Sequence, residues 1–378
     1  MAGLEQVLFA DKGQETPPYV NRATIRDVAR KAKVSHQTVS RVINGHNSVT
    51  PETRERVAHA IRELEYVPSQ VARSLSSSRT HTLGMVTTDV SDHFFAEAVA
   101  GADAEARKHG FFLIIGSIEP GAEDDERTYL RLLLERRVEG LIIAIPRLRL
   151  ADDDLLAGAA ARLPIVVVAS DIELPGADHV DIDNRRGGLE ATNYLLAQGH
   201  RLIATITGPL DWPSARARLD GYRDALRGNS TTEAQVVEPS LDWGLESGRR
   251  AAERLLAVAK RPTAIFAQSD LLALGAIAAL RAHGLRVPDD VSIIGFDDIP
   301  VAEVFDPPLT TLRQPMREVG ELAARLVADP HSGARRGKAT RRHVLRAPLV
   351  VRGSVAPLRL KSDTDAGRSA RVVRATKG

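Results

Sequence analysis

Near the N-terminus, two short helical segments are separated by only two residues, Lys33 and Val34. The first segment starts at Thr24, which is followed three residues later by Asp27 in a pattern that resembles a capping box. The second starts at Ser35, and its apolar residues recur four and seven positions later. Helices joined by so short a turn cross at a steep angle, so the sequence predicts a helix-turn-helix.

A third helix is expected to complete a small bundle. Thr50 can cap this helix and Pro51 suits its first helical position. Its apolar stripe consists of Val57, Ile61 and Leu64. These three segments together predict a compact helical unit in front of a much longer chain.

The second helix turns a polar, cationic face outward. That face consists of Ser35, His36, Gln37, Thr38, Ser40 and Arg41. Arginine can bind guanine with two hydrogen bonds, glutamine can bind adenine, and serine or threonine can reach phosphates. Residues 22–81 carry 11 Lys and Arg against 5 Asp and Glu, although the whole chain has a net charge of only +2. The coincidence favours DNA as the partner over a structural bundle with a solvated basic face.

A second short amphipathic segment follows the bundle. Pro68 ends the third helix region, and Ser69 can cap another helix in which Val71, Ala72 and Leu75 share one face. A helix of two turns is marginal in water, so residues 69–76 are expected to be helical only when something holds them. The alternative is a plain serine-rich linker.

From residue 81 onward, short apolar runs alternate with amphipathic stretches. This alternation predicts βαβ units and parallel sheets, with roughly four to five units on each side of residue 182. Such a chain forms two stacked α/β lobes. Ligands bind at the carboxyl ends of parallel strands, and two lobes facing each other make a cleft that closes on a small molecule.

Polar side chains gather where the predicted strands end. The clearest are Asp89, Asp270 and Asp297, and the segment 208–222 adds arginines. Carboxylates and an arginine fork hydrogen-bond hydroxyl groups, while an aromatic ring covers the apolar face of a sugar. The alternative for each residue is a surface ion pair or a helix cap.

The run VSHQTVSRVIN over residues 34–44 resembles the DNA-binding headpiece of the LacI/GalR family of bacterial transcriptional regulators, and the resemblance extends over residues 24–354. It implies that His36, Gln37 and Arg41 read bases. Lys33 stands where the family commonly has glycine, at a cost of order 1 kcal/mol if its backbone is left-handed. The DNA-contacting residues implied by the resemblance are Thr24, Ser35, His36, Gln37, Thr38, Ser40, Arg41, Asn44, Ala72 and Leu75.

In this family the segment after the third helix is a hinge helix, which orders when two copies pair over the minor groove. The resemblance implies that Leu75 wedges between base steps and that Ala72 lies close to the groove floor.

The remaining chain resembles the effector domain of that family, which shares the periplasmic sugar-binding fold. The resemblance implies three crossings between the lobes, near residues 182, 312 and 340. Ser269 stands where many relatives have asparagine. The implied effector-binding residues are Asp89, Phe95, Asp183, Arg216, Trp243, Asp270, Asp297 and Gln314.

Catalytic signatures are absent from the sequence: it has no nucleophile elbow, zinc-protease motif, phosphate-binding loop or dinucleotide-binding glycine pattern. Without cysteine there is no disulfide framework or cysteine-ligated metal. We therefore predict a homodimeric transcription factor that binds a palindromic operator, needs no cofactor or metal, and responds to a small molecule, expected to be a sugar. The alternatives are a regulator that responds to a nucleoside or nucleobase, an α/β enzyme, or a binding protein for transport.

The predicted organisation has five parts. They are a disordered extension (1–21), the headpiece (22–67), the hinge helix and linker (68–80), the two-lobed effector-binding and dimerisation domain (81–354), and a disordered basic tail (355–378). No secretory signal or membrane span is evident, so the expected location is the cytoplasm.

Overall fold

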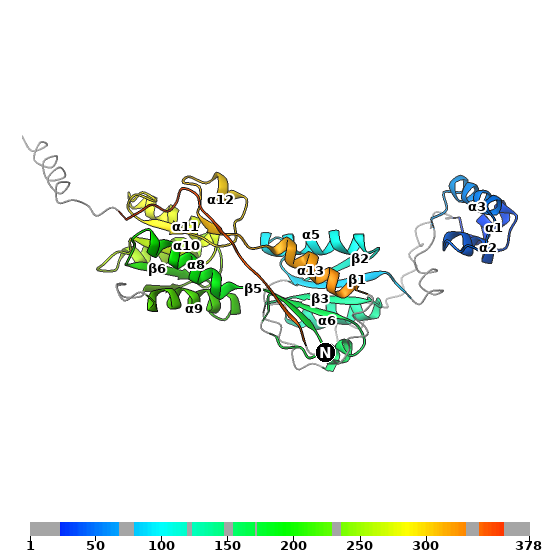
Figure 1. Cartoon of the computed structure of the whole chain (residues 1–378), viewed down its shortest axis with the longest axis horizontal. Coiled ribbons are helices and arrows are strands. Elements are labelled where there is room, and N and C mark those ends of the chain that lie inside the picture. The colour runs from blue at the N-terminus through cyan, green and yellow to red at the C-terminus, as the bar shows by residue number, and fades with distance from the viewer. Residues whose placement is uncertain are drawn as a thin grey trace, which may run out of the picture. The chain divides into compact units, whose positions relative to one another are not determined.

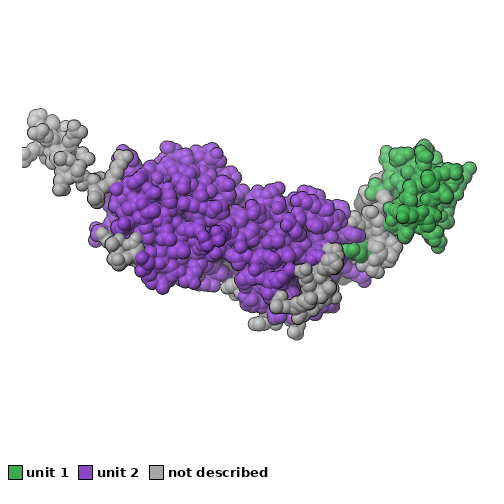
Figure 2. All heavy atoms as spheres, in the orientation of Figure 1, with its two compact units in different colours: residues 1–80 green, residues 81–378 purple. Residues whose placement is uncertain are grey.

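The computed structural model describes most of the chain and divides it into two compact units, residues 1–80 and 81–378 (Figure 2). The described residues are 23–67, 79–118, 123–146, 154–170, 172–228, 236–329 and 340–358. The predicted hinge helix, the N-terminal extension and most of the C-terminal tail lie outside them. The two units are described separately below.

The first unit contains the predicted helix-turn-helix and a third helix. These are α1 (Ile25–Ala32), α2 (His36–Ile43) and α3 (Pro51–Glu63). Thr24 and Asp27 form a reciprocal capping box at the start of α1. The three helices bury a small core that includes Val28, Val39 and Val57.

The turn between α1 and α2 depends on a left-handed backbone at Lys33. This residue has φ 53° and ψ 47°, and its amide donates to the carbonyl oxygens of Ala29 and Arg30 at the end of α1. The conformation expected at this position is confirmed. A lysine therefore occupies a place where glycine has no steric penalty.

The second unit begins with a lobe built on a six-stranded parallel sheet, which we call the N-lobe (Figure 1). Helices α5 (His93–Lys108) and α13 (Met316–Ala328) cover one face of the sheet, and α6 (Glu123–Glu135) and α7 (Asp154–Ala160) cover the other. In spatial order the strands are β11 (Arg342–Leu345), β5 (Asp178–Ile182), β4 (Ile165–Val168), β3 (Gly140–Ala144), β1 (Thr82–Thr88) and β2 (Phe112–Ile118).

The other lobe, which we call the C-lobe, has a four-stranded parallel sheet. In spatial order its strands are β7 (Val236–Pro239), β6 (Ile203–Thr207), β8 (Ala264–Ala267) and β9 (Ser292–Ile294). Its helices are α8 (Asn184–Ala197), α9 (Pro213–Arg227), α10 (Leu245–Leu256), α11 (Asp270–Ala282) and α12 (Val301–Val304). The alternation of strands and helices read from the sequence thus gives two α/β lobes, as predicted.

The chain crosses between the lobes three times. The first crossing joins β5 to α8, and the second follows the short strand β10 (Thr311–Leu312) and leads into α13. The third crossing was predicted near residue 340 and lies later, after β11. The reason is that β11 pairs in parallel with β5 and so belongs to the N-lobe, before β12 (Leu349–Val350) pairs with β10.

Adjacent helices approach closely at facing glycines. A Cβ atom at Gly101 of α5 would lie 2.1 Å from the carbonyl oxygen of Arg317, and one at Gly320 of α13 would lie 1.9 Å from that of Ala98. Only glycine fits such positions, because backbone meets backbone there. The pairs α8–α9 and α10–α11 repeat the arrangement with Gly188, Gly221, Gly248 and Gly275.

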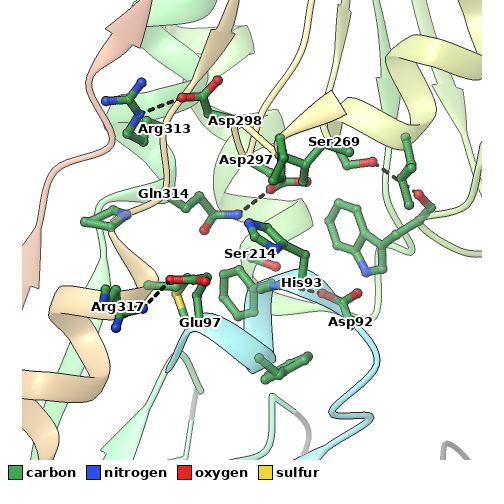
Figure 3. Close-up of a pocket in the computed structure, with 18 of the residues that line it drawn as sticks. Asp92, His93, Glu97, Ser214, Ser269, Asp297, Asp298, Arg313, Gln314 and Arg317 are labelled. Atoms are coloured by element: carbon green, nitrogen blue, oxygen red, sulfur yellow. Dashed lines mark hydrogen bonds and ion pairs between the residues drawn. The ribbon is translucent and has the colours of Figure 1, made fainter. Parts of the chain in front are cut away.

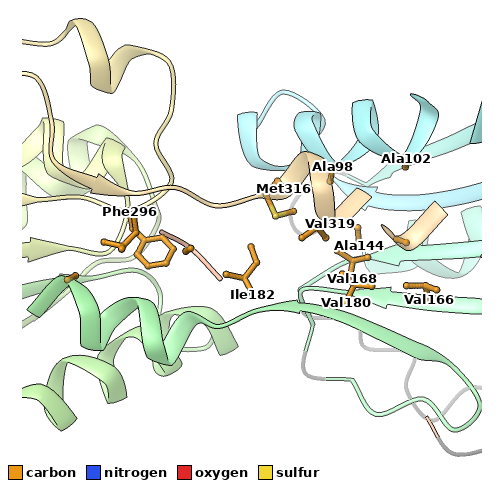
Figure 4. Close-up of a cluster of buried hydrophobic side chains, with 14 of the residues drawn as sticks. Ala98, Ala102, Ala144, Val166, Val168, Val180, Ile182, Phe296, Met316 and Val319 are labelled. Carbon is orange, nitrogen blue, oxygen red and sulfur yellow. The ribbon is translucent and has the colours of Figure 1, made fainter. Parts of the chain in front are cut away.

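A hydrophobic cluster runs through both lobes along these crossings (Figure 4). Val180 and Ile182 belong to it in β5, Phe296 belongs to it in the C-lobe, and Met316 and Val319 belong to it in α13. The segments that connect the lobes are therefore part of the core.

The last described residues correct one predicted boundary. The disordered tail was expected to start at residue 355, yet residues 355–358 pack on the C-lobe. The amide of Leu358 donates to the carbonyl oxygen of Gln198, and the amide of Ala356 donates to Ser292 Oγ at 3.1 Å. Within the described ranges, no helix has the length and apolar character needed to cross a membrane.

Candidate DNA-binding and effector sites

Helix α2 presents the side chains expected to read DNA. His36, Gln37 and Arg41 are exposed, whereas Val39 on the opposite side is fully buried. Thr38 and Ser40 of the same helix are half-buried. One face of a single helix thus carries a cation, an amide and an imidazole toward solvent, as a major-groove helix requires.

The other predicted headpiece residues support the ends of the helices. Ser35 Oγ accepts from the amide of Thr38 at 3.1 Å, and Thr24 Oγ1 donates to Asp27 Oδ2 at 2.7 Å. Asn44 ends α2, and its side-chain Nδ2 donates to Ser40 Oγ at 3.4 Å. Ala72 and Leu75, the predicted minor-groove residues, lie outside the described residues.

A cavity of about 730 Å³ lies between the two lobes of the second unit (Figure 3). It is open at the carboxyl ends of the strands, where several helices begin. The N-lobe contributes the start of α5 and α13, and the C-lobe contributes the loops after β6, β7, β8 and β9. This is where parallel α/β sheets bind ligands.

Arg218 of α9 lies at the C-lobe wall of the cavity and is 3% exposed. Its guanidinium group stacks 3.7 Å from the ring centroid of Phe296. Nε donates to Asn184 Oδ1 at 2.8 Å, and Nη1 donates to the carbonyl oxygen of Gln268. Burial lowers the pKa of Arg218 to about 10, while the nearby Asp297 and Asp270 carboxylates oppose that change. The group therefore remains cationic at neutral pH.

Asp297 lies beside this arginine, with Oδ1 3.9 Å from Arg218 Nη1. Its backbone has φ 123°, a region that strongly favours glycine, and such strain persists where the surrounding structure enforces it. Gln314 Nε2 donates to the same oxygen. Burial raises the pKa of Asp297 to about 6, although Arg218 and Gln314 act in the opposite direction.

Asp298 connects this wall of the cavity to residues that follow β10 and β12. Its carboxylate pairs with Arg313 Nε at 2.6 Å and with Arg352 Nη1 at 2.6 Å. Arg313 follows β10, where the chain leaves for the N-lobe, and Arg352 follows β12. Asp297 and Asp298 together hold Gln314 and Arg313, so the cavity and the second crossing share two direct contacts.

Aromatic rings supply the apolar part of the cavity. Trp212 and Trp243 meet edge to face with centroids 5.7 Å apart, and both line the C-lobe side. Phe94 and Phe95 pack edge to face at 4.9 Å on the N-lobe side. Gly208 leaves room for Trp243, because a Cβ atom there would lie 2.2 Å from the indole ring.

Of the eight predicted effector residues, four line the cavity: Phe95, Trp243, Asp297 and Gln314. Three of the others have local or structural partners. Asp89 is exposed and accepts from Ser91, and Asp183 caps α8. Asp270 is fully buried beneath the cavity, where it accepts from the hydroxyl of Thr311 and the amide of Ile299. Burial, and then Asp297, raises the pKa of Asp270.

The arginine that lines the cavity is not the one that was predicted. Arg216 is exposed and donates to the carbonyl oxygen of Leu210 at 3.0 Å, while Arg218 lines the cavity. Two residues along a helix correspond to a rotation of about 200°, so the two arginines lie on opposite faces. The phase of α9 could have identified the right one, because Arg218 shares a face with the buried residues Ala215 and Tyr222.

Most residues that line the cavity were not among the predicted effector residues, and four of these are polar or aromatic groups next to the predicted ones. The four are Asp92, His93, Trp212 and Ser269. Asp92 and His93 lie at the start of α5, and Figure 3 shows them among the side chains that line the cavity. Their place just after the end of β1 was the available signal.

A helix-turn-helix with an exposed reading face, followed by a two-lobed α/β domain that encloses a polar and aromatic cavity, defines a ligand-controlled DNA-binding regulator. The profile described as "Bacterial regulatory proteins, lacI family" matches residues 24–69, and that of a periplasmic binding protein-like domain matches residues 192–355. The HTH-type transcriptional repressor CytR of Escherichia coli K12 is 36% identical over 355 residues, which is 92% of this chain and 99% of CytR.

Solved structures agree with this assignment. The lac repressor dimer bound to operator and the anti-inducer ONPF is 31% identical, with a TM-score of 0.79 over 88% of this chain and 99% of the repressor chain. The complex of the transcriptional regulator CelR with cellobiose is 35% identical, with a TM-score of 0.63 over 88% of this chain and all of CelR. The chain belongs to the LacI family of bacterial transcriptional regulators: it is a sequence-specific DNA-binding protein with a small-molecule effector domain.

Proposed function

We propose that this regulator is a homodimeric repressor whose α2 reads a palindromic operator with His36, Gln37 and Arg41. The exposure of these three side chains on one helix face supports the assignment. The lac repressor, which is similar over most of the chain, is a dimer bound to operator. Two copies of α2 related by a two-fold axis require an operator with matching half-sites.

The dimer surface is proposed to include the edge of the N-lobe sheet. Among the described strands, β2 pairs with β1 alone, and it exposes Phe112, Ile114 and Ile115. Apolar side chains on an edge strand are a liability in a monomer, because the strand invites pairing with other chains. A second copy covering β2 would remove this liability.

We propose that the effector is a sugar or sugar derivative bound between the lobes. The observation that carries this proposal is the combination of Arg218, Asp297 and Gln314 with the rings of Trp212 and Trp243 in one cavity. The polar groups suit hydroxyls, and the rings suit an apolar ring face. The cellobiose complex of CelR gives a precedent in a similar chain.

A nucleoside is the second candidate, and the aromatic content of the cavity favours it. The pairs Trp212–Trp243 and Phe94–Phe95 lie on different lobes. A planar base stacks well on such rings, while its ribose presents hydroxyls to Arg218 and Asp297.

Closure of the lobes on the effector is proposed to change operator affinity. Gln314 and Arg313 lie in the second crossing and contact Asp297 and Asp298 in the cavity wall. A ligand that displaces these carboxylates therefore acts on the segment that connects the lobes. Couplings of this kind are typically about 1–3 kcal/mol.

Tryptophan fluorescence can report ligand binding in the cavity. The chain has two tryptophans, Trp212 and Trp243, and both line the cavity. Titration of the full chain with common sugars and nucleosides is expected to change tryptophan fluorescence in a saturable way. The active compound should then shift binding to a labelled palindromic duplex, measured by fluorescence anisotropy. A chain that binds all duplexes equally at physiological salt would refute the repressor assignment.

The proposal gives the chain a regulatory role and no catalytic one, which the naming of CytR as a repressor supports. A repressor meets its operator in the compartment that holds the chromosome, so the proposed location is the cytoplasm.

A further inference from the structure

The charged groups around the effector cavity are unequal in number. Its lining contains three arginines, Arg218, Arg313 and Arg317. It also contains five carboxylates: Asp92, Glu97, Asp297, Asp298 and Glu318. A ligand between the lobes therefore enters a space in which carboxylates predominate.

Each of the three arginines already has a carboxylate partner. Arg317 pairs with Glu97 at 3.2 Å and Arg313 pairs with Asp298 at 2.6 Å. Arg218 lies 3.9 Å from Asp297 and also donates to two neutral acceptors. Among the lining residues that the structure describes, each arginine thus has a carboxylate nearby, and His93 is the remaining basic side chain.

Two lining carboxylates, Asp92 and Glu318, form no ion pair with an arginine or a lysine among the described residues. Asp92 accepts from the amide of Phe94 at 2.8 Å, and Glu318 is exposed in the first turn of α13. Asp92 lies on the N-lobe and acts electrostatically on Asp297 of the C-lobe, where it helps to raise the pKa of that carboxyl group. The two lobes therefore face each other with like charges.

At two helix N-termini around the cavity, side chains already accept from the free amides. Asp92 caps α5 by accepting from the amide of Phe94, and Ser269 Oγ accepts from the amide of Leu272 in α11 at 3.1 Å. Helix α9 begins with Pro213, which has no amide hydrogen. Helix α13 has no side-chain cap, but Glu318 in its first turn places a negative charge there. A phosphate group normally needs several free amides or cations together.

We propose, on the basis of the effector site assigned above, that this cavity takes an uncharged or cationic ligand and rejects phosphorylated sugars and nucleotides. The paired arginines and the excess of carboxylates, which includes Asp92 and Glu318, oppose binding of a phosphate dianion. The regulator therefore senses the unphosphorylated form of its effector.

The test uses matched pairs of compounds that differ only by a phosphate group: ribose and ribose 5-phosphate, glucose and glucose 6-phosphate, cytidine and cytidine monophosphate. The full chain is titrated with each compound, and tryptophan fluorescence is the readout. For any pair that binds, the parent compound is expected to bind at least about tenfold more tightly, since a charge placed near an unpaired carboxylate costs more than 1.4 kcal/mol. Equal or tighter binding of the phosphorylated member would overturn the proposal.

Titration with inorganic phosphate and sulfate keeps the two proposals distinguishable. If no parent compound binds, the sugar and nucleoside assignment fails on its own. The charge proposal is then decided by these anions. Absence of a saturable fluorescence change supports it, and saturable binding refutes it.

Asp92→Asn tests the local origin of the discrimination. Asparagine also caps helices well, so the start of α5 is retained while the charge is removed. We expect the ratio of dissociation constants within a binding pair to fall by about threefold or more. The matched control is Asp220→Asn, on the outer face of α9 and outside the cavity lining, which should leave the ratio unchanged. An equal shift in both variants would contradict a local effect.

If no pair binds, the same variants are titrated with inorganic phosphate. Binding that appears in Asp92→Asn and not in Asp220→Asn supports the proposal, as does absence of binding in both. Binding in the unmodified chain refutes it.

Discussion

The headpiece and the effector domain place their functional residues in opposite ways. In α2 the reading side chains lie within six consecutive residues and point to solvent, from His36 to Arg41. In the cavity, Asp92, Arg218 and Asp297 come from distant parts of the chain and meet between two lobes. A surface site of the first kind requires only a stable helix, whereas a site of the second kind requires the whole fold.

The two regions also differ in how their carboxylates respond to the fold. Hydrogen bonds from Thr24 lower the pKa of Asp27, and the Lys31 ammonium group lowers that of Glu63, in the headpiece. Burial raises the pKa of Asp297 and of Asp270 in the effector domain. The two headpiece carboxylates stabilise the fold as anions, whereas burial of Asp297 and Asp270 opposes their charged form and costs stability at neutral pH.

Arg218→Ala should have the largest effect on stability and on the effector response. It should also separate the effector domain from the headpiece, because operator binding is expected to persist. Truncation leaves Asp297 and Asp270 buried without their cation, and breaking a buried ion pair of this kind costs about 3–5 kcal/mol. We expect loss of the tryptophan fluorescence response to effector and a lower midpoint of denaturant unfolding. Operator binding, measured by anisotropy where the variant is folded, should persist without regulation.

Arg216→Ala is the matched control, two residues away on the exposed face of α9. It should change stability by no more than about 0.5 kcal/mol and leave the effector response intact. If Arg216→Ala abolished the response and Arg218→Ala did not, the assignment of the cavity arginine would be wrong.

The sequence predicted local features of the fold better than it predicted contacts between distant segments. The headpiece was predictable, because capping residues, a two-residue turn and a contiguous polar face are local features. The alternation of strands and helices also predicted two lobes. The partners of Asp270 were not predictable, because a strand-end carboxylate reads the same whether it points into a cavity or accepts from Thr311 beneath it.

Packing between loops also limited the prediction of the tryptophans that line the cavity. Trp243 was selected, while Trp212, its edge-to-face partner, was not. Their contact depends on the loops after β6 and β7 lying side by side, and on Gly208 making room for the indole ring. Such packing between segments has no signature in either segment alone.

Asp297→Asn should alter the pH dependence of stability. Because the pKa of Asp297 in the folded chain is raised from 3.8 to about 6, the folded state binds more protons than the unfolded state in this window. The contribution of Asp297 to stability therefore falls as pH rises from about 4 to about 6, by up to roughly 3 kcal/mol in all. Denaturant unfolding of the variant at pH 4, 5, 6 and 7 should show a stability curve without this loss.

The headpiece supplies the contrasting control. Asp27 has a lowered pKa, so its contribution is present above the ordinary value of 3.8 and is lost as pH falls below it. Asp27→Asn should therefore lower the stability of the headpiece at neutral pH and have a smaller effect on stability in acid. The same sign of pH dependence in both variants would contradict the comparison of the two regions.

Arg41→Ala should act on DNA alone. Loss of one bidentate base contact costs about 1–3 kcal/mol and flattens the preference at a guanine. Competition between operator variants, measured by anisotropy at fixed salt, is the test, and effector titration by tryptophan fluorescence should be unchanged. Unaltered discrimination among operators would remove Arg41 from the reading face.

Arg62→Ala in α3 is the control for charge. Arg62 is exposed on a helix other than the reading helix. It should lower affinity for all duplexes alike, if at all, because phosphate contacts carry no direct sequence information.

Lys33→Gly should have the smallest effect and the opposite sign to the other substitutions in the headpiece. The left-handed backbone at Lys33, with φ 53°, costs a lysine about 1 kcal/mol, and glycine removes most of that cost. Part of the gain is offset because glycine gives the unfolded chain more freedom. Native-state hydrogen exchange of the buried α1 and α2 amides, measured in the full chain, should therefore slow by up to about fivefold.

Lys31→Gly tests whether this gain comes from backbone conformation or from loss of a positive charge. Lys31 lies inside α1 and pairs with Glu63, so glycine there removes helix propensity and an ion pair. The change should destabilise the headpiece by about 1 kcal/mol and speed exchange of the same amides. If both substitutions slowed exchange, charge density in the headpiece would be the cause, and the turn at Lys33 would carry no strain. Opposite signs would locate the strain in the two-residue turn that defines the helix-turn-helix.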